Sequence, residues 1–100
     1  MPQILKSHLA EEDLINIWRY TYRNRGVEQA DFYLNDLDQS LHLLAKSPEL
    51  ARLREELNPP VRIHRHNHHL LVYKIIDSGI RLIRVLHESM DIENQLYQDE

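Results

Sequence analysis

The spacing of apolar residues changes once along this chain, from helical to extended, and this change constrains the fold more than any other feature. Before Pro48, apolar residues recur every three or four positions, as on one face of a helix. From Val61 onward they alternate or run together, as in strands. Helices followed by strands are typical of an α+β fold. With 100 residues, the chain is expected to form one domain spanning 1–100.

Two helices are expected in the first half. Ser7 is a suitable N-cap, and the apolar spacing from Leu14 to Tyr22 predicts a first helix that ends near Gly26. The second helix ends at Ser47-Pro48, because the residue before a proline is pushed out of helical geometry. So short a connection makes the two helices antiparallel neighbours. A further helical turn is expected within residues 50–57.

The rest of the chain is typical of strands with a helical end. Residues 3–6 are expected to form an N-terminal edge strand, and Asn67 and Gly79 supply turns between later strands. Three antiparallel strands are predicted at 61–66, 70–76 and 80–87. A short helical tail is predicted within 89–96. The expected fold is an N-terminal strand, an antiparallel helical hairpin, a three-stranded antiparallel sheet and a C-terminal helical tail.

Charge is distributed unevenly. Between Val61 and Arg84 there are five basic side chains and one acid, whereas five acids and no Lys or Arg follow Arg84. The net charge of -4 and pI near 5.9 argue against a protein that must neutralise many phosphates. We therefore expect no direct specific nucleic-acid binding, while a local basic face for an acidic protein partner fits the pattern.

The sequence contains no membrane or disulfide signal. No segment approaches the roughly 18 uninterrupted apolar residues of a membrane helix, and the start does not resemble a signal peptide. The chain has no cysteine, which excludes a disulfide framework and a thiolate zinc site. We expect a cytoplasmic protein that does not enter a membrane and needs no cofactor.

Four histidines lie within the six positions from His64 to His69. On the predicted strand His64 and His66 share a face, and Asn67 is the natural turn residue. A His-X-His pair alone is a weak signal for a metal site, and no carboxylate lies within the cluster. A polar hairpin tip is therefore favoured over a metal site, and no metal ligand is predicted.

Catalytic chemistry receives little support. There is no cysteine nucleophile and no Gly-X-Ser-X-Gly elbow. His87 with Glu88 and Asp91 could supply an acid and a base, but adjacent strand residues point to opposite faces. No catalytic residue is predicted. The aromatic residues Trp18, Tyr22 and Tyr33 favour packing of the helical hairpin, or anchoring of a partner helix at a groove rim.

Five groups of residues, in order along the chain, carry a family resemblance. They are Asp13-Leu-Ile-Asn-Ile-Trp18-Arg-Tyr20; Gly26-Val-Glu-Gln29-Ala30 with Tyr33; Leu43-Leu-Ala45 with Pro48; Arg62, His69 and Tyr73; and Arg84-Val-Leu-His87-Glu-Ser-Met90-Asp91. Together they resemble the ParE toxins of the RelE/ParE superfamily, from about Leu5 to Leu96. The last group is the most specific.

The resemblance implies the toxin component of a bacterial type II toxin–antitoxin system, with the α+β fold predicted above. ParE toxins inhibit DNA gyrase by stoichiometric binding and arrest growth. They are silenced by an antitoxin whose disordered C-terminal segment folds across the toxin. The expected partners are therefore a ParD-like antitoxin and DNA gyrase, and the protein is not expected to be an enzyme.

Two sets of surface residues follow from the resemblance. The set expected to bind the target, or to hold that surface in shape, is Arg62, Arg84, His87, Met90 and Asp91. The set expected to bind the antitoxin is Trp18, Tyr22, Tyr33 and Tyr73. A structural ion pair between Arg84 and Asp91 is the alternative for those two residues.

The superfamily also contains ribosome-dependent mRNA endonucleases of the RelE type, and fold alone does not separate the two activities. Those nucleases are cationic near the C-terminus, where this chain carries Glu88, Asp91 and Glu93. Negative charge there would oppose phosphate binding and the charge that develops in the transition state. Stoichiometric binding therefore ranks above cleavage, with Arg62, His64, Arg65 and His87 as the residues of the nuclease alternative.

Overall fold

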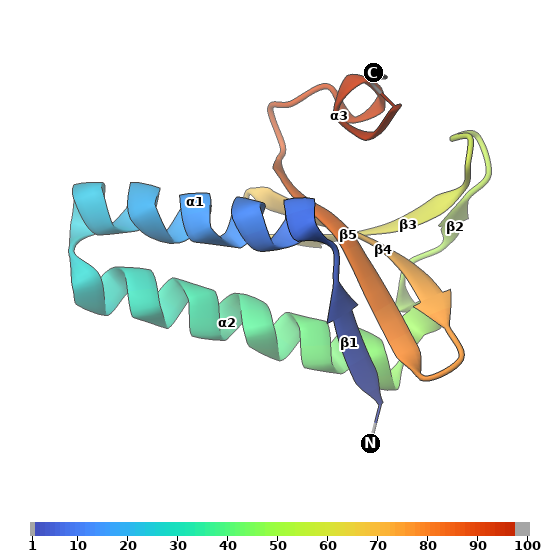
Figure 1. Cartoon of the computed structure of the whole chain (residues 1–100), viewed down its shortest axis with the longest axis horizontal. Helices are drawn as coiled ribbons and strands as arrows, with labels where there is room; N and C mark the ends of the chain where they lie inside the picture. The colour runs from blue at the N-terminus through green and yellow to red at the C-terminus, as the bar shows by residue number, and fades with distance from the viewer. Residues whose placement is uncertain (1, 98–100) are drawn as a thin grey trace.

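The computed structural model describes residues 2–97 and has the predicted α+β order (Figure 1). Its elements are β1 (Gln3–Lys6), α1 (His8–Arg25), α2 (Val27–Lys46), a short 3-10 turn η1 (Pro48–Leu50), β2 (Leu53–Arg54), β3 (Val61–His66), β4 (His69–Ile76), β5 (Gly79–His87) and α3 (Ile92–Tyr97). Within this described part, no helix combines the length and the apolar character needed to cross a membrane.

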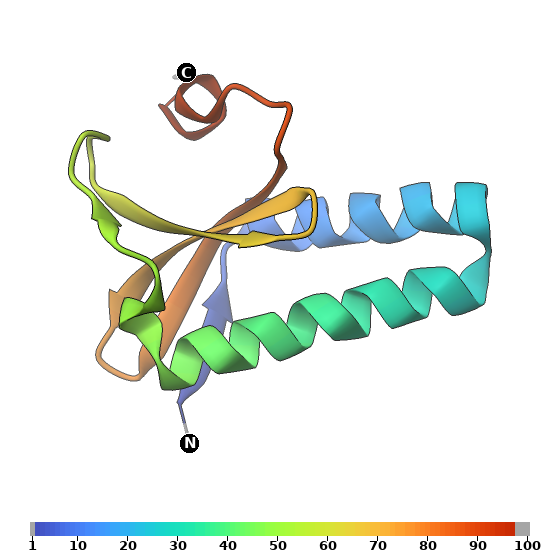
Figure 2. The same ribbon diagram turned by 180° about the vertical axis from the view of Figure 1, so that it is seen from behind.

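The helical hairpin begins and ends at the predicted residues. The hydroxyl of Ser7 accepts a hydrogen bond from the backbone N–H of Ala10 at 3.0 Å, which caps α1. Gly26 closes α1 with a positive φ of 91°, and its N–H donates to the carbonyl of Tyr22 at 2.9 Å. Only Gly26 separates the helices, which lie side by side in both views (Figures 1 and 2).

The sheet has five strands in the order β1-β5-β4-β3-β2 (Figure 2). The three predicted strands pair antiparallel, and β1 adds to β5 in parallel as an edge strand. The helical turn expected within residues 50–57 is wrong. That segment contains β2, whose Arg54 pairs with Val61, and the helical turn is confined to Pro48–Leu50. The edge of β3 offers backbone partners that a local helical pattern does not reveal.

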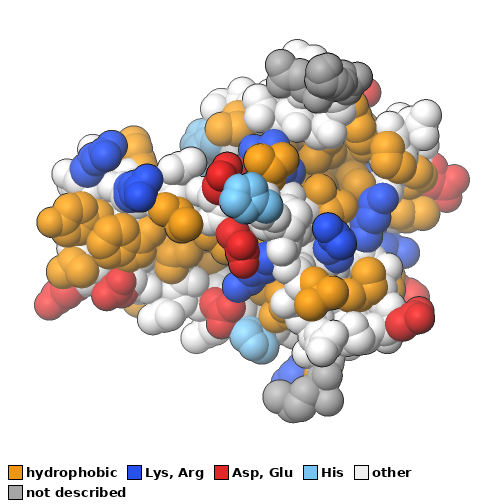
Figure 3. All heavy atoms as spheres, viewed as in Figure 1, with side chains coloured by type: hydrophobic (Ala, Val, Ile, Leu, Met, Phe, Trp, Pro, Cys, Tyr) orange, Lys and Arg blue, Asp and Glu red, His pale blue; other side chains and the backbone are white. Residues whose placement is uncertain are grey.

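Two hydrophobic clusters lie on opposite faces of the sheet. The larger packs the sheet against the helical hairpin and includes Leu37, Leu41, Leu71, Tyr73 and Leu82. The smaller lies under α3 and contains Leu57, Val61, Ile63, Val72 and Leu86. The centre of β4 is therefore buried on both faces, as its continuous apolar run predicts. In the view of Figure 3, Lys and Arg side chains lie close together right of the centre, next to exposed hydrophobic side chains.

A bulge in β5 decides which side chains face the helices. Val72 pairs with Arg84, but the next residue, Tyr73, pairs with Leu82, so Ile83 is an extra residue in β5. Such a bulge reverses the alternation of side chains beyond it. Val85 consequently joins the cluster under the helices, and His87 lies on the same face.

Candidate functional site

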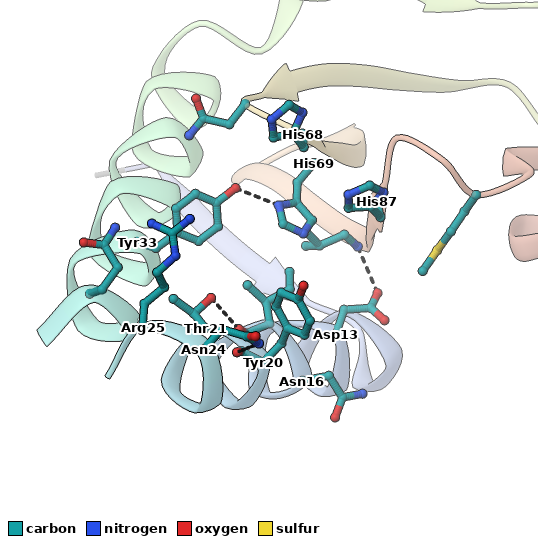
Figure 4. A pocket seen from close by; sticks show the side chains of 15 residues that line it. Asp13, Asn16, Tyr20, Thr21, Asn24, Arg25, Tyr33, His68, His69 and His87 are labelled. Carbon is teal, nitrogen blue, oxygen red and sulfur yellow. Dashed lines mark hydrogen bonds between the residues drawn. The ribbon is translucent and has the colours of Figure 1, made fainter. Parts of the chain in front are cut away.

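A groove of about 1060 Å³ runs between the helical hairpin and the turn that joins β3 to β4 (Figure 4). We call it the hairpin groove. The side chains that line it come from α1, α2, the β3–β4 turn and the end of β5, and they are Asp13, Asn16, Ile17, Tyr20, Thr21, Asn24, Arg25, Gln29, Tyr33, Asn67, His68, His69, Val85, His87 and Met90.

Helical geometry brings the α1 residues to this wall. Asp13, Ile17, Tyr20 and Asn24 follow one another at spacings of three or four residues, which places them along one face. Tyr20 is 70% exposed, so its ring stands at the rim instead of packing in the core. Exposed aromatic rings at a groove rim are favoured anchors for protein partners.

Three histidines form a row across the inner wall. In the strand register, His66 pairs with His69, and His69 pairs with His87. The hydroxyl of Tyr33 lies 2.6 Å from Nδ1 of His69, and Ser40 Oγ lies 2.8 Å from Nδ1 of His66. Two α2 residues thereby attach the helical hairpin to the strand row, and they fix how these two imidazoles are oriented.

The histidine cluster occupies a hairpin tip, as predicted. Asn67 has a φ of 55°, the left-handed conformation that a tight turn requires and that asparagine tolerates. Nε2 of His66 lies 3.1 Å from a carboxylate oxygen of Asp36 but makes no hydrogen bond. Across residues 2–97, no three His, Asp or Glu side chains gather in a way that could hold a metal ion.

His69 is held neutral in the groove wall. Burial, followed by the charges of neighbouring histidines, lowers the pKa of His69 to about 4. Nδ1 of His87 accepts the backbone N–H of Ser89 at 3.1 Å, so a neutral His87 carries its proton on Nε2. The groove therefore offers an imidazole N–H donor at His87 beside the uncharged ring of His69.

The lowered pKa of His69 predicts a loss of stability in mild acid. The unfolded chain takes up a proton near the ordinary histidine pKa of about 6.5, but the folded chain does so only near 4, so stability falls as pH drops through this window. Because His69 is only half-buried, we expect a loss of about 1–2 kcal/mol beyond that of a His69→Gln variant between pH 7 and pH 4. Urea unfolding at several pH values measures this difference. A His64→Gln control should retain the His69 contribution, and parallel curves for wild type and His69→Gln would contradict the assignment.

An ion pair holds the groove wall to α1. Nε and Nη2 of Arg84 donate to the carboxylate of Asp13 at 2.8 and 3.0 Å, and the backbone N–H of Val85 donates to the same carboxylate at 2.9 Å. Both side chains are only 15% exposed. The hydrogen bond and charge of Asp13 raise the pKa of Arg84 above its ordinary value despite burial. The alternative ion pair of Arg84 with Asp91 is therefore wrong, because Asp13 is the partner.

The five residues expected at the target surface do not form one patch. His87 and Met90 line the hairpin groove, and Met90 is 44% exposed. Asp91 instead caps α3 by accepting the backbone N–H groups of Glu93 and Asn94. Arg62 lies at the far end of β3, where it donates to the carbonyl of Ala51 at 2.7 Å.

The four aromatic residues expected at the antitoxin surface also separate. Tyr33 lines the groove, whereas Trp18 stacks on Tyr22 with ring centroids 5.2 Å apart and donates to Asp31 of α2. Tyr73 is fully buried and donates its hydroxyl hydrogen to the carbonyl of Pro48. Tyr73 therefore supports the core and offers no surface for direct contact.

The residues of the nuclease alternative do not converge. Arg62 and Arg65 are three positions apart on β3, so they point to opposite faces. Arg65 pairs with Glu88, whereas Arg62 contacts Ala51. Burial lowers the pKa of His64, which lies between the two arginines.

Sequence reasoning missed much of the α1 wall. Asp13, Asn16, Tyr20 and Asn24 all line the groove, but only the helical spacing of Ile17 and its apolar neighbours was informative beforehand. The polar residues at the same spacing were the available signal, because they lie on one helical face. The contact of Asp13 with Arg84 and Val85 of β5 depends on strand register and the bulge, which have no such signal.

Comparison with known proteins gives one consistent family. The profile described as "ParE toxin of type II toxin-antitoxin system, parDE" matches residues 4–92. Toxin ParE1 of Mycobacterium tuberculosis is 36% identical over 93 residues, which are 92% of this chain and 95% of that protein. Toxin ParE1 of Caulobacter vibrioides is 34% identical over 92 residues, covering 90% of this chain and 93% of that protein.

A solved structure also matches the fold. It is described as "Chromosomal ParDE TA system from P. aeruginosa" and superposes with a TM-score of 0.73. The match covers 87% of this chain and 96% of that chain at 19% sequence identity. At this identity the likeness concerns the arrangement of helices and strands alone.

Proposed function

The chain belongs to the ParE toxin family of type II toxin–antitoxin systems, and from this premise we propose that it inhibits DNA gyrase by stoichiometric binding. The observation that carries the proposal is the family match, which spans residues 4–92 and so includes both walls of the hairpin groove. The cytoplasm is the compartment in which such a toxin would meet gyrase.

The hairpin groove is the proposed contact for the target. His87 and Met90 stand at its β5 end, and Tyr20 forms the opposite rim. A half-exposed methionine is a flexible apolar contact, and the imidazole of His87 adds a hydrogen-bond donor. Arg84 acts from below by holding the end of β5 against α1. It is thus a positioning residue for this surface, as Asp91 is for α3.

A cognate ParD-like antitoxin is the proposed inhibitor. Tyr33 in the groove and the stacked pair of Trp18 and Tyr22 on α1 are aromatic anchors of the kind that partner helices cover. The "ParDE" description of the matched structure supports such a pairing. If the antitoxin covers Tyr33, it also obstructs the groove that we assign to the target. Neutralisation would then be competition for one surface.

Binding is favoured over mRNA cleavage. Arg62 and Arg65 point to opposite faces of β3, and Arg65 is already paired with Glu88. A nuclease site needs cationic and acid–base groups that converge on one phosphate. This geometry supports mRNA cleavage of the RelE type less than it supports stoichiometric binding of a protein target.

Pulse labelling of DNA and protein synthesis in bacteria tests the proposal. The chain is expressed without an antitoxin, and the order in which the two syntheses stop is recorded. An early fall in DNA synthesis with induction of the DNA-damage response is the expected result. An early fall in protein synthesis, with transcripts cut at codons in primer-extension mapping, would reject gyrase inhibition and favour cleavage by Arg62, Arg65 and His87.

Met90→Ala should weaken inhibition of purified gyrase by about tenfold while leaving the unfolding free energy nearly unchanged, because the side chain is exposed at the groove. A supercoiling assay with titrated toxin measures the change. Leu50→Ala is a matched control, since Leu50 is 56% exposed but lies outside the groove. Equal potency of Met90→Ala and wild type would remove Met90 from the target surface.

A further inference from the structure

Two cationic side chains stand directly opposite each other on the sheet face that α3 covers only in part. Lys74 of β4 pairs with Arg81 of β5, so both side chains leave the sheet on the same side. This side faces away from the helical hairpin, because the flanking residues Tyr73, Ile80 and Leu82 fill the core beneath α1 and α2. Both Lys74 and Arg81 are exposed.

This pair is unfavourable in the protein alone. Like charges directly opposite on antiparallel strands destabilise the pair. In the part of the chain that the structure describes, neither Lys74 nor Arg81 takes part in an ion pair within 4.0 Å, whereas Arg65 and Arg84 are paired with Glu88 and Asp13. An anion bound between Lys74 and Arg81 would offset their repulsion.

The neighbouring strand adds an apolar side chain to the row. Leu5 of β1 lies opposite Arg81 in the parallel register and is 46% exposed. Lys74, Arg81 and Leu5 therefore follow one another across β4, β5 and β1, at the spacing of about 4.8 Å between neighbouring strands. We call these three residues the Lys74–Arg81 patch.

We propose that the Lys74–Arg81 patch binds an acidic segment of a protein partner, in which carboxylates lie next to an apolar residue. The row spans about 10 Å, and three alternate residues of an extended segment, which share one face, span about 13 Å, a difference that long Lys, Arg and Glu side chains can absorb. Two carboxylates would pair with Lys74 and Arg81, and the apolar side chain would cover Leu5. Because adjacent side chains of an extended segment point to opposite faces, a segment of the type Glu-X-Glu-X-Leu has this pattern on one face.

The composition of the patch favours a peptide over a nucleic acid. Two cations can neutralise only two phosphates, and Leu5 offers nothing to a sugar–phosphate backbone. The net charge of -4 also repels a long polyanion, while a short segment meets mainly the local charge. Because the hairpin groove lies on the helix side of the sheet, this patch is a separate site and does not depend on gyrase as the target.

Fluorescence anisotropy with a labelled peptide of sequence Glu-Glu-Leu-Glu-Glu-Leu tests the proposal on the full chain. At low salt the peptide should bind more tightly than its Gln-for-Glu analogue and than an oligothymidylate of equal charge. Lys74→Gln and Arg81→Gln should each weaken peptide binding by about three- to fivefold. Arg23→Gln, an equal charge change at the exposed end of α1, is the matched control and should bind as wild type does.

Thermal unfolding supplies a second readout. Lys74→Gln should raise Tm by about 1–4 °C, because it removes the repulsion across the strands, whereas Arg23→Gln should not.

Equal binding of the acidic and neutral peptides would overturn the proposal, as would equal losses of peptide binding in Arg23→Gln and Arg81→Gln. If the oligothymidylate bound more tightly than the acidic peptide, and Arg81→Gln abolished that binding, the patch would be a nucleic-acid site instead. A lower Tm for Lys74→Gln than for wild type would show that Lys74 and Arg81 do not destabilise the protein by repulsion.

Discussion

Gly79→Ala is expected to lower the free energy of unfolding by about 3 kcal/mol, which is a large share of the stability of a small domain. A Cβ at this position would lie 2.0 Å from the carbonyl oxygen and 2.6 Å from the nitrogen of Gln3. These are backbone atoms of β1, so relief requires the strand to move. Gly79 also has a φ of 153°, a backbone conformation that residues other than glycine rarely adopt.

The damage should be concentrated where β1 meets β5. Gln3 donates its backbone N–H to the carbonyl of Ser78 at 2.6 Å, and this contact lies beside the added methyl group. Urea unfolding followed by circular dichroism measures the total loss, and hydrogen exchange of the Gln3–Lys6 amides locates it.

Gly26→Ala is the matched control for Gly79→Ala. Gly26 also has a positive φ, of 91°, but a Cβ there would meet no atom within 4 Å. Its substitution should cost only about 1 kcal/mol from backbone conformation. Equal losses for the two variants would show that close approach of β1 to Gly79 is not what requires glycine.

Asp13→Ala is expected to cost about 3 kcal/mol, because it leaves the mostly buried guanidinium of Arg84 without its carboxylate. The backbone N–H of Val85 loses its acceptor in the same step. The end of β5 should then separate from α1, so the loss should extend to the gyrase-inhibition assay through the displaced His87. Chemical denaturation measures the change in the free energy of unfolding.

Two further variants test whether the loss in Asp13→Ala comes from the broken ion pair with Arg84. Glu12→Ala removes an exposed carboxylate from the adjacent position of α1, where it pairs with His8 at the surface, and should change stability by less than about 0.5 kcal/mol. The double variant Asp13→Ala with Arg84→Met should recover part of the loss, since no unpaired charge remains. A loss in Asp13→Ala no larger than in Glu12→Ala would exclude this ion pair as a support of the groove.

Much of the fold could be predicted because its signals are local. Ser7, Gly26 and Ser47-Pro48 act on their immediate backbone neighbours, so the ends of both long helices follow from capping and steric rules. The turn at Asn67 is equally local. The β2 strand was missed because its two residues gain hydrogen bonds only from β3, which no local pattern shows.

The candidate site was predictable only in part. Tyr33, His87 and Met90 were expected at partner surfaces and do line one groove. Tyr73 was expected at a surface, but β4 crosses the centre of the sheet and buries it. Asp13 carried no sequence signal as the partner of Arg84, because 71 positions separate the two residues.

By itself, the sequence determined the order of helices and strands, the ends of the helical hairpin and the family to which the chain belongs. The tertiary structure alone decided that β1 joins β5 in parallel, that Asp13 reaches Arg84, and that the extra residue Ile83 turns Val85 and His87 toward the helices. Capping and periodicity depend on neighbours along the chain. Register and bulges depend on contacts between distant segments, and a shift of one residue exchanges the two faces of a strand.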